Sequence, residues 1–176
     1  SLAEKIATDP RVSFLTFIGS GKVGWGLRSK LAEGARCALE HGGAAPVIVE
    51  ADADIDDALP LLAKGGFYHA GQVCVSVQRV FVHEDIVEEF SNKLVAIAEK
   101  LVVGDPADEK TEVGPLIQEG EVERIHEWVE EAKAAGGKIL TGGKKIGKTC
   151  YEPTVILNPP YDTSVSQCEI FGPVIN

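Results

Sequence analysis

The chain has 176 residues, of which 44% are hydrophobic and 25% are charged, and its formal net charge is −10. A chain of this length can bury a substantial core, and its negative charge repels phosphate backbones and anionic membrane surfaces, so we expect neither a nucleic-acid nor a membrane partner. No apolar run approaches the roughly 20 residues that span a bilayer, and the N-terminal residues lack the profile of a secretory signal. We therefore expect a cytoplasmic protein.

Four cysteines and four histidines are spread along the chain. The cysteines show no C-x-x-C pairing and are too few to staple the fold, which fits a reducing compartment. The histidines do not fall at ligand spacing with each other or with the cysteines, so no metal site is predicted. The chain lacks methionine, begins in a helix-like pattern and stops as a strand starts. We expect a segment of a longer protein, or a chain whose ends were trimmed.

The first half of the chain predicts strands and helices in alternation. An apolar run rich in β-formers, VSFLTFI, is followed by a glycine turn, GSGKVG, and a helical pattern. Asp52 and Asp54 are candidate caps for a later helix. In chain order we predict a strand at 12–18, a helix at 25–35, two short buried strands at 35–40 and 45–50, and a helix at 52–70.

The second half continues this alternation. Apolar residues recur at helical spacing in two long segments, and a turn-rich connection, GDPADEKTEVGPLI, joins them. In order we predict a strand at 76–83, helices at 84–101 and 119–137, a strand at 138–140, a loop at 142–148 and a strand at 151–158. Strands that alternate with helices indicate an α/β fold with a largely parallel sheet.

The turn GSGKVG, residues 19–24, satisfies G-x-G-x-x-G between a predicted strand and a predicted helix. This pattern is typical of a dinucleotide site in which an acidic residue about 20 positions later, here Glu40, holds ribose hydroxyls. A plain tight turn is the simpler interpretation. Glu40 could instead act as a general base for chemistry at Cys74, and one carboxylate cannot have both roles.

Cys74 lies in the stretch FYHAGQVCVSVQRV, residues 67–80, three residues after a glycine. Composition alone favours a buried core thiol, because free cysteines are among the most buried residues. A nucleophile would need to stay accessible in surroundings that favour the thiolate.

Four stretches together resemble the NAD(P)-dependent aldehyde dehydrogenase superfamily. Each matches a family motif in order and spacing, the four motifs being F-T-G-S-x-x-x-G, E-L-G-G-K-x-P, F-x-N-x-G-Q-x-C and E-E-I-F-G-P-V. The corresponding stretches are FIGSGKVG (17–24), LEHGGAAP (39–46), FYHAGQVC (67–74) and CEIFGPV (168–174).

The resemblance implies a mechanism and a set of site residues. It implies that Cys74 is the nucleophile and Glu40 the general base, which removes the ribose role from Glu40 and gives it to Glu169. The cofactor would be NAD or NADP. The remaining cofactor contacts implied by the family pattern are Gly19, Ser20, Gly24 and Phe171.

The resemblance also implies a three-layer α/β architecture, present here as a partial chain. Residues 1–40 would be the C-terminal part of the NAD(P)-binding domain, and residues 41–176 a truncated catalytic domain. The substrate would be a small aldehyde, and the full-length protein a homo-oligomer. The family's oxyanion-hole asparagine and its adenosine contacts precede residue 1, so we expect the isolated segment to be inactive.

Five positions depart from the family pattern. Threonine, leucine, lysine, asparagine and glutamate are replaced by Ile18, His41, Ala44, His69 and Cys168, respectively. None of these changes removes the nucleophile or the base. For the two histidines we expect local packing and backbone hydrogen bonding rather than a proton relay.

Two alternatives remain at this stage. One is a relative that passes the acyl group to coenzyme A or reduces an acyl phosphate, although such branches generally lack a glutamate equivalent to Glu40. The other is a non-catalytic nucleotide-binding or assembly fragment.

Overall fold

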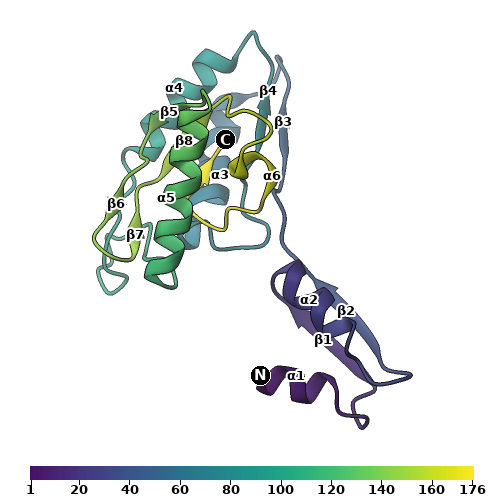
Figure 1. Ribbon diagram of the computed structural model, residues 1–176. Coiled ribbons are helices and arrows are strands. Elements are labelled where there is room, and N and C mark those ends of the chain that lie inside the picture. The colour runs from purple at the N-terminus through teal and green to yellow at the C-terminus, as the bar shows by residue number, and fades with distance from the viewer. The chain divides into compact units, whose positions relative to one another are not determined.

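The structure is a computed structural model that describes all residues from 1 to 176. The chain divides into two compact units, Ser1–Gly43 and Ala44–Asn176 (Figure 1). The assignment of the predicted segments to a cofactor domain and a catalytic domain stays a prediction.

The first unit contains two parallel strands and two helices. They are α1 (Leu2–Ala7), β1 (Phe14–Ile18), α2 (Gly21–Arg28) and β2 (Arg36–Glu40). The register of β1 and β2 runs from Phe14 opposite Arg36 to Ile18 opposite Glu40.

Helix α2 differs from the helix that we predicted at 25–35. It begins inside the glycine turn, because Ser20 takes an extended conformation and the following residues are helical. It ends at Arg28, and Gly34, with φ of 81°, turns the chain before β2. Glycine adopts this left-handed conformation without the steric cost of a Cβ.

The second unit contains the remaining elements. They are β3 (Val47–Val49), α3 (Ile55–Phe67), the one-turn segment η1 (Tyr68–Gly71), β4 (Val80–Val82), α4 (Val87–Ala98), α5 (Glu119–Ala134), β5 (Lys138–Thr141), β6 (Lys145–Ile146), β7 (Cys150–Tyr151), β8 (Thr154–Leu157), α6 (Ser164–Gln167) and β9 (Val174–Ile175).

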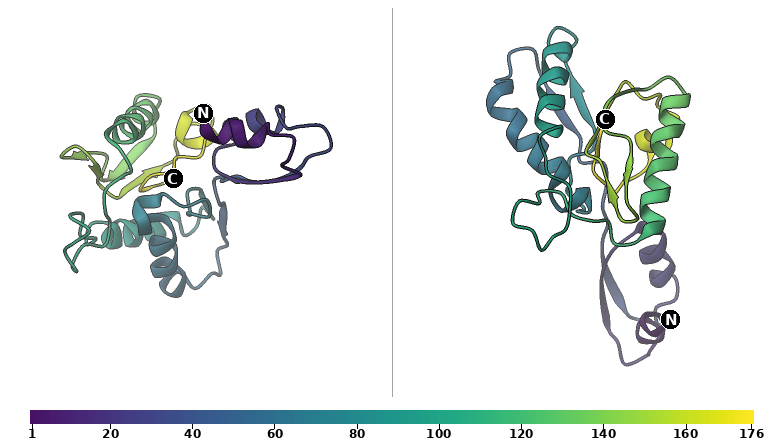
Figure 2. Two further views of the ribbon diagram at one scale, coloured as in Figure 1. Left: turned by 90° about the horizontal axis from the view of Figure 1, so that it is seen from below. Right: turned by 90° about the vertical axis from the view of Figure 1, so that its left-hand side faces the viewer.

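The strands of the second unit form three hydrogen-bonded groups, β3–β4, β5–β8–β9 and β6–β7. The pairs β3–β4 and β8–β9 are parallel, and β5–β8 is antiparallel. Asn176, directly after β9, donates its N–H to the Gln78 carbonyl (2.8 Å) and accepts from the Val80 N–H (2.7 Å), which joins β9 to the β4 side. Helices α3 and α4 lie on one side of these strands and α5 on the other (Figure 2). The predicted α/β architecture with largely parallel pairing is confirmed.

The core of the second unit forms where the helices pack on these strands. Helix α5 buries one apolar stripe, Val122, Ile125, Val129 and Ala132, as its spacing predicts. Helix α4 likewise buries Phe90, Leu94 and Ala98. None of the helices is both long and apolar enough to cross a bilayer.

Several local details differ from the sequence predictions. The loop predicted at 142–148 contains β6, which forms an antiparallel hairpin with β7. The strand predicted at 45–50 is not buried throughout, because Ile48 is 73% exposed on β3, which pairs only with β4. Of the two candidate caps, Asp54 is the one that caps α3, accepting the Asp57 N–H at 3.1 Å.

Candidate functional site

Cys74 lies in a turn between η1 and β4. The Ser76 N–H donates to the Val73 carbonyl at 2.9 Å and closes this turn around Cys74. The thiol is exposed, so the buried core thiol that composition favours is not what the fold produces. Cys168 is also exposed, whereas Cys37 and Cys150 are partly buried. Exposure alone therefore does not distinguish Cys74 from Cys168.

The segment before Cys74 has a strained backbone. His69, Ala70 and Gly71 have φ values of 50°, 54° and 70°, all in the left-handed region. Non-glycine residues in this region cost about 1–3 kcal/mol each and persist only where the surroundings impose them. Here the surroundings include the Gly172 carbonyl, which a Cβ on Gly71 would strike. The turn that carries Cys74 is therefore in backbone contact with the segment that contains Glu169 and Phe171.

Two polar side chains fix the Cys74 turn to its neighbours. The Gln72 amide donates to the His69 and Pro115 carbonyls (3.1 and 3.3 Å) and accepts from the Ile117 N–H (2.9 Å). The Ser76 hydroxyl donates to the Gly65 carbonyl of α3 at 3.1 Å. A surface depression borders this turn, and its lining includes His69, Gln72, Pro115, Ile117 and Phe171.

Glu169 has a carboxylate oxygen without a partner. The residue is half-buried, and its Oε1 atom is buried with no hydrogen-bond donor in reach. Such an acceptor costs free energy unless a donor reaches it, and a ribose hydroxyl is a donor of the required kind. Phe171, two residues later, is 41% exposed with φ of 51°. The chemistry of this segment fits a dinucleotide cofactor.

The glycine turn of the first unit is fastened to the end of β2. The Gly19 N–H donates to the Glu40 carbonyl at 3.1 Å, and His41 Nδ1 donates to the Gly19 carbonyl at 3.0 Å. Glu40 itself is exposed. Ser20 is the N-cap residue of α2, but its hydroxyl makes no capping hydrogen bond, so it is free to meet a ligand.

Gly24 is buried in α2, where a Cβ would come within 2.5 Å of His41 Cε1. This close helix–strand packing is what the last glycine of a dinucleotide turn permits. His41 thus makes the local packing and the backbone hydrogen bond that we expected for it.

The predicted site residues fall into two groups. Cys74, Glu169 and Phe171 belong to the second unit, where backbone contact brings their segments together. Glu40 belongs to the first unit together with the cofactor residues of the glycine turn. Sequence reasoning assigned no role to Gln72 or Gln78, although Gln78 is a polar residue in a strand-like apolar run and is only 4% exposed.

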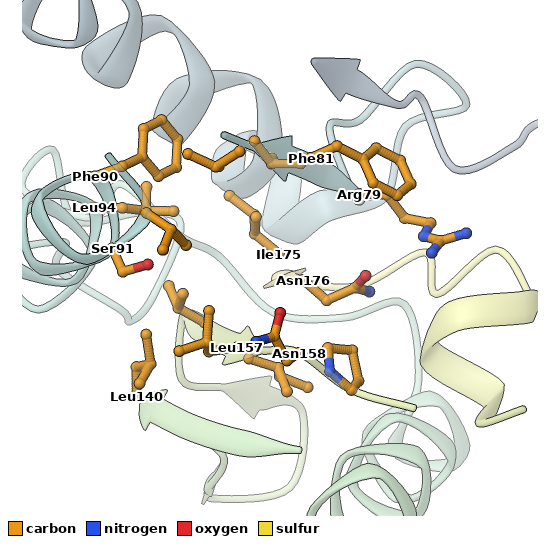
Figure 3. A pocket seen from close by; sticks show the side chains of 16 residues that line it. Arg79, Phe81, Phe90, Ser91, Leu94, Leu140, Leu157, Asn158, Ile175 and Asn176 are labelled. Carbon is orange, nitrogen blue, oxygen red and sulfur yellow. The ribbon is translucent and has the colours of Figure 1, made fainter. Parts of the chain in front are cut away.

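An apolar pocket elsewhere in the second unit contains none of these residues. It lies between β4, β8 and α4, beside the C-terminal residue (Figure 3). Phe81, Phe90, Leu94, Leu157 and Ile175 contribute to its lining. Polar residues, among them Ser91 and Asn158, also line it.

The sequence model for the Aldehyde dehydrogenase family matches residues 1–176. The chain therefore belongs to the aldehyde dehydrogenase family. It is 44% identical over 174 residues to 3-sulfolactaldehyde dehydrogenase of Priestia aryabhattai. The aligned region covers 99% of this chain and 36% of that protein. The chain thus spans about a third of the length of the curated relatives that it matches.

Solved structures show the same fold. Glyceraldehyde-3-phosphate dehydrogenase GapN of Methanocaldococcus jannaschii, complexed with NADP, is 41% identical with a TM-score of 0.94, over 99% of this chain and 38% of that one. An NAD-dependent aldehyde dehydrogenase of Sinorhizobium meliloti is 38% identical with a TM-score of 0.94, over 98% of this chain and 35% of that one. Relatives of this chain thus use NAD or NADP.

Proposed function

We propose that this chain carries the covalent chemistry of an NAD(P)-dependent aldehyde dehydrogenase, with Cys74 as the nucleophile. The observation that carries the proposal is an exposed thiol on a strained turn that packs against the Glu169–Gly172 segment. In this scheme the first unit is the C-terminal part of the cofactor domain, and the second unit is part of the catalytic domain.

The first step is the attack of the Cys74 thiolate on the aldehyde carbon, which forms a carbon–sulfur bond and an alkoxide. An aldehyde carbon releases hydride readily only when it carries a second heteroatom, and sulfur supplies that atom and later leaves well. The Cys74 backbone N–H can stabilise the alkoxide as one oxyanion donor. Bound NAD+ or NADP+ would accept the hydride, and a thioester on Cys74 is left.

Glu40 has the second role. Its carboxylate takes a proton from water as the water oxygen attacks the thioester carbon, and the thiolate of Cys74 leaves. The products are a carboxylic acid and the regenerated thiolate. General-base catalysis of this kind contributes about 10²–10⁴-fold in rate. Release to water rather than to coenzyme A follows from this carboxylate.

The proposed cofactor contacts lie on the Glu169–Phe171 segment of the second unit and on the glycine turn of the first. Glu169 Oε1 would accept a hydrogen bond from a hydroxyl of the nicotinamide ribose, and Phe171, two residues later, offers an exposed ring. In the first unit, Gly19, Ser20 and Gly24 form the turn that the cofactor meets. Ser20 offers a hydroxyl that its own helix does not use.

The test is a hybrid enzyme, in which residues 1–176 replace the matching segment of the Priestia 3-sulfolactaldehyde dehydrogenase. We expect NADH or NADPH formation from 3-sulfolactaldehyde without coenzyme A. Cys74→Ser should abolish it, whereas the matched change Cys168→Ser, at the other exposed thiol of the second unit, should leave it nearly unchanged.

Glu40→Gln in the hybrid enzyme should give a burst of reduced cofactor followed by turnover that is slower by about 10²–10⁴-fold, because the amide cannot take a proton from water. An inactive hybrid enzyme beside an active parent would count against the proposal. Equal losses in Cys74→Ser and Cys168→Ser would remove Cys74 from the nucleophile role, and a requirement for coenzyme A would favour the acyl-transferring alternative.

A further inference from the structure

Gln78 is a buried amide that joins two distant parts of the second unit. It lies four residues after Cys74, at the start of the run that leads to β4, and is 4% exposed. Its Nε2 donates to the Val165 carbonyl (3.0 Å) and the Cys168 carbonyl (2.8 Å), and its Oε1 accepts the Ile170 N–H (2.8 Å). Both polar atoms of the side chain are therefore engaged with one segment about 90 residues later in the chain.

These hydrogen bonds fall on the two sides of Glu169. The Cys168 carbonyl belongs to the peptide group that precedes Glu169, and the Ile170 N–H belongs to the peptide group that follows it. One side-chain amide therefore holds both peptide groups of Glu169. Arg124 fixes the next group along, because its Nη2 donates to the Ile170 carbonyl at 2.7 Å.

The surroundings of this segment leave it little freedom. Ile170 is 1% exposed, and a Cβ on Gly172 would strike Ile125. On the far side of Gln78, its backbone carbonyl accepts the Asn176 N–H at 2.8 Å. The backbone of Gln78 is thus fixed by Asn176, while its side-chain amide binds the peptide groups of Glu169.

We propose that Gln78 is a positioning residue that fixes the Glu169 carboxylate at the depth where it meets the nicotinamide ribose, and so sets the affinity for that half of the cofactor. This inference rests on the proposed function. It adds that the position of Glu169 depends on an amide placed four residues after the nucleophile, so that one short stretch of chain carries Cys74 and orients the cofactor contact.

A purely structural role makes a different prediction. A buried amide that only satisfied polar groups would, when removed, lower stability and weaken the binding of every part of the cofactor to a similar extent. A positioning role acts through Glu169, so its loss should weaken ligands that contain the nicotinamide ribose and spare those that lack it. NAD+ and ADP form such a pair.

The experiment measures the binding of NAD+ and of ADP, together with KM for NAD+ and kcat, in the hybrid enzyme. Gln78→Met keeps the shape of the side chain and removes the three hydrogen bonds. Gln167→Met is the matched control, since Gln167 is an exposed glutamine in the adjacent helix α6. We expect Gln78→Met to raise the Kd and KM for NAD+ by about tenfold, the equivalent of one lost hydrogen bond to a charged group, and to change the Kd for ADP less than twofold.

The decisive measurement is a double-mutant cycle with Glu169→Ala, which removes the carboxylate acceptor, whereas a Gln amide oxygen could still accept the ribose hydroxyl. If Gln78 acts through Glu169, Gln78→Met should change NAD+ affinity little further once Glu169→Ala is present. Effects of the two changes that simply multiply would overturn the inference, and so would an equal loss for NAD+ and ADP. If Gln78→Met does not fold, Gln78→Asn, which withdraws the amide by one methylene, takes its place in the same cycle.

The NAD+ affinity of Glu169→Ala tests the ribose contact separately from the role of Gln78. If this variant alone keeps full NAD+ affinity, the ribose contact is wrong and the inference falls with it. If it loses NAD+ affinity while Gln78→Met does not, the ribose contact stands and only the positioning role of Gln78 is rejected.

Discussion

The two units hold their candidate site residues by different means. In the second unit, the segments that carry Cys74 and Glu169 contribute Ala70 and Ile170 to an extensive core, and the buried Gln78 amide binds the Glu169 segment. In the first unit, only Ala7 and Leu27 are buried apolar side chains, and Ile18 and Trp25 are 75% and 55% exposed.

The comparison shows that two sets of predicted site residues can be held in place by different interactions. The first unit fixes Glu40 and its glycine turn mainly through one strand pair and a few backbone hydrogen bonds. Such a unit buries too little apolar surface to resist local opening strongly, because the free energy of opening grows with the area buried.

The largest expected effect is therefore a difference in amide hydrogen exchange within the intact chain. We expect the amides of β1 and β2 to exchange at least about 100-fold faster than those of α5 and β8, which corresponds to ~2.8 kcal/mol of opening free energy. Exchange resolved by mass spectrometry or NMR measures this directly. Equal protection in both units would show that the first unit opens only with the second.

A pair of isoleucine truncations should give an effect of comparable size. Ile125 is fully buried in α5, and Ile125→Ala should lower the free energy of unfolding of the second unit by about 2–5 kcal/mol. Ile18→Ala, at a side chain that is 75% exposed, should change stability by less than about 0.5 kcal/mol. Chemical denaturation of both variants beside the unaltered chain provides the comparison. Similar losses would mean that Ile18 is covered in solution.

Much of the fold of the second unit could be predicted because its patterns are long. The apolar stripes of α4 and α5 span several turns, and each buries the face that its spacing indicates. The short strands of the β6–β7 hairpin were not predicted, because two residues are too few to show an alternating pattern. The end of α2 at Arg28 was not predicted, because the residues that follow it have ordinary helical propensity and do not mark the boundary.

The residue types of the candidate site come from the sequence, and its local geometry comes from the fold. The motif around Cys74 names the thiol, but the left-handed conformation of His69 and Ala70 before it is one that neither residue type favours. The partners of Gln78 lie about 90 residues away, and only the fold brings them together. A polar residue inside an apolar run is the sequence pattern that indicates such a buried contact.

Two glycines of α2 provide a matched test of packing in the first unit. Gly24→Ala places a methyl group against His41 and Phe17 and should destabilise the β1–α2–β2 packing by about 1–3 kcal/mol. Gly26 has open space around it, so Gly26→Ala should stabilise the same helix by roughly 0.5–1 kcal/mol. Exchange rates of the β1 amides report both changes. A stabilising effect of Gly24→Ala would show that His41 moves aside at little cost.

The smallest expected effect concerns the strained run before Cys74. His69 has φ of 50°, and Asn tolerates this left-handed region better than most residues, because its short polar side chain can bond locally. We expect His69→Asn to raise the free energy of unfolding by less than about 0.5 kcal/mol, and His69→Ala to lower it by a similar amount, since alanine has no such compensation. The two variants differ from the unaltered chain at one exposed side chain, so the core is unchanged. Thermal unfolding of the three proteins, with alkylation rates of Cys74 measured in parallel, tests whether the core of the second unit alone imposes this conformation. The two variants could unfold at the same temperature while Cys74 is alkylated at different rates. That result would mean that the backbone strain is relieved locally, so the packing of the second unit does not by itself fix the conformation of this turn.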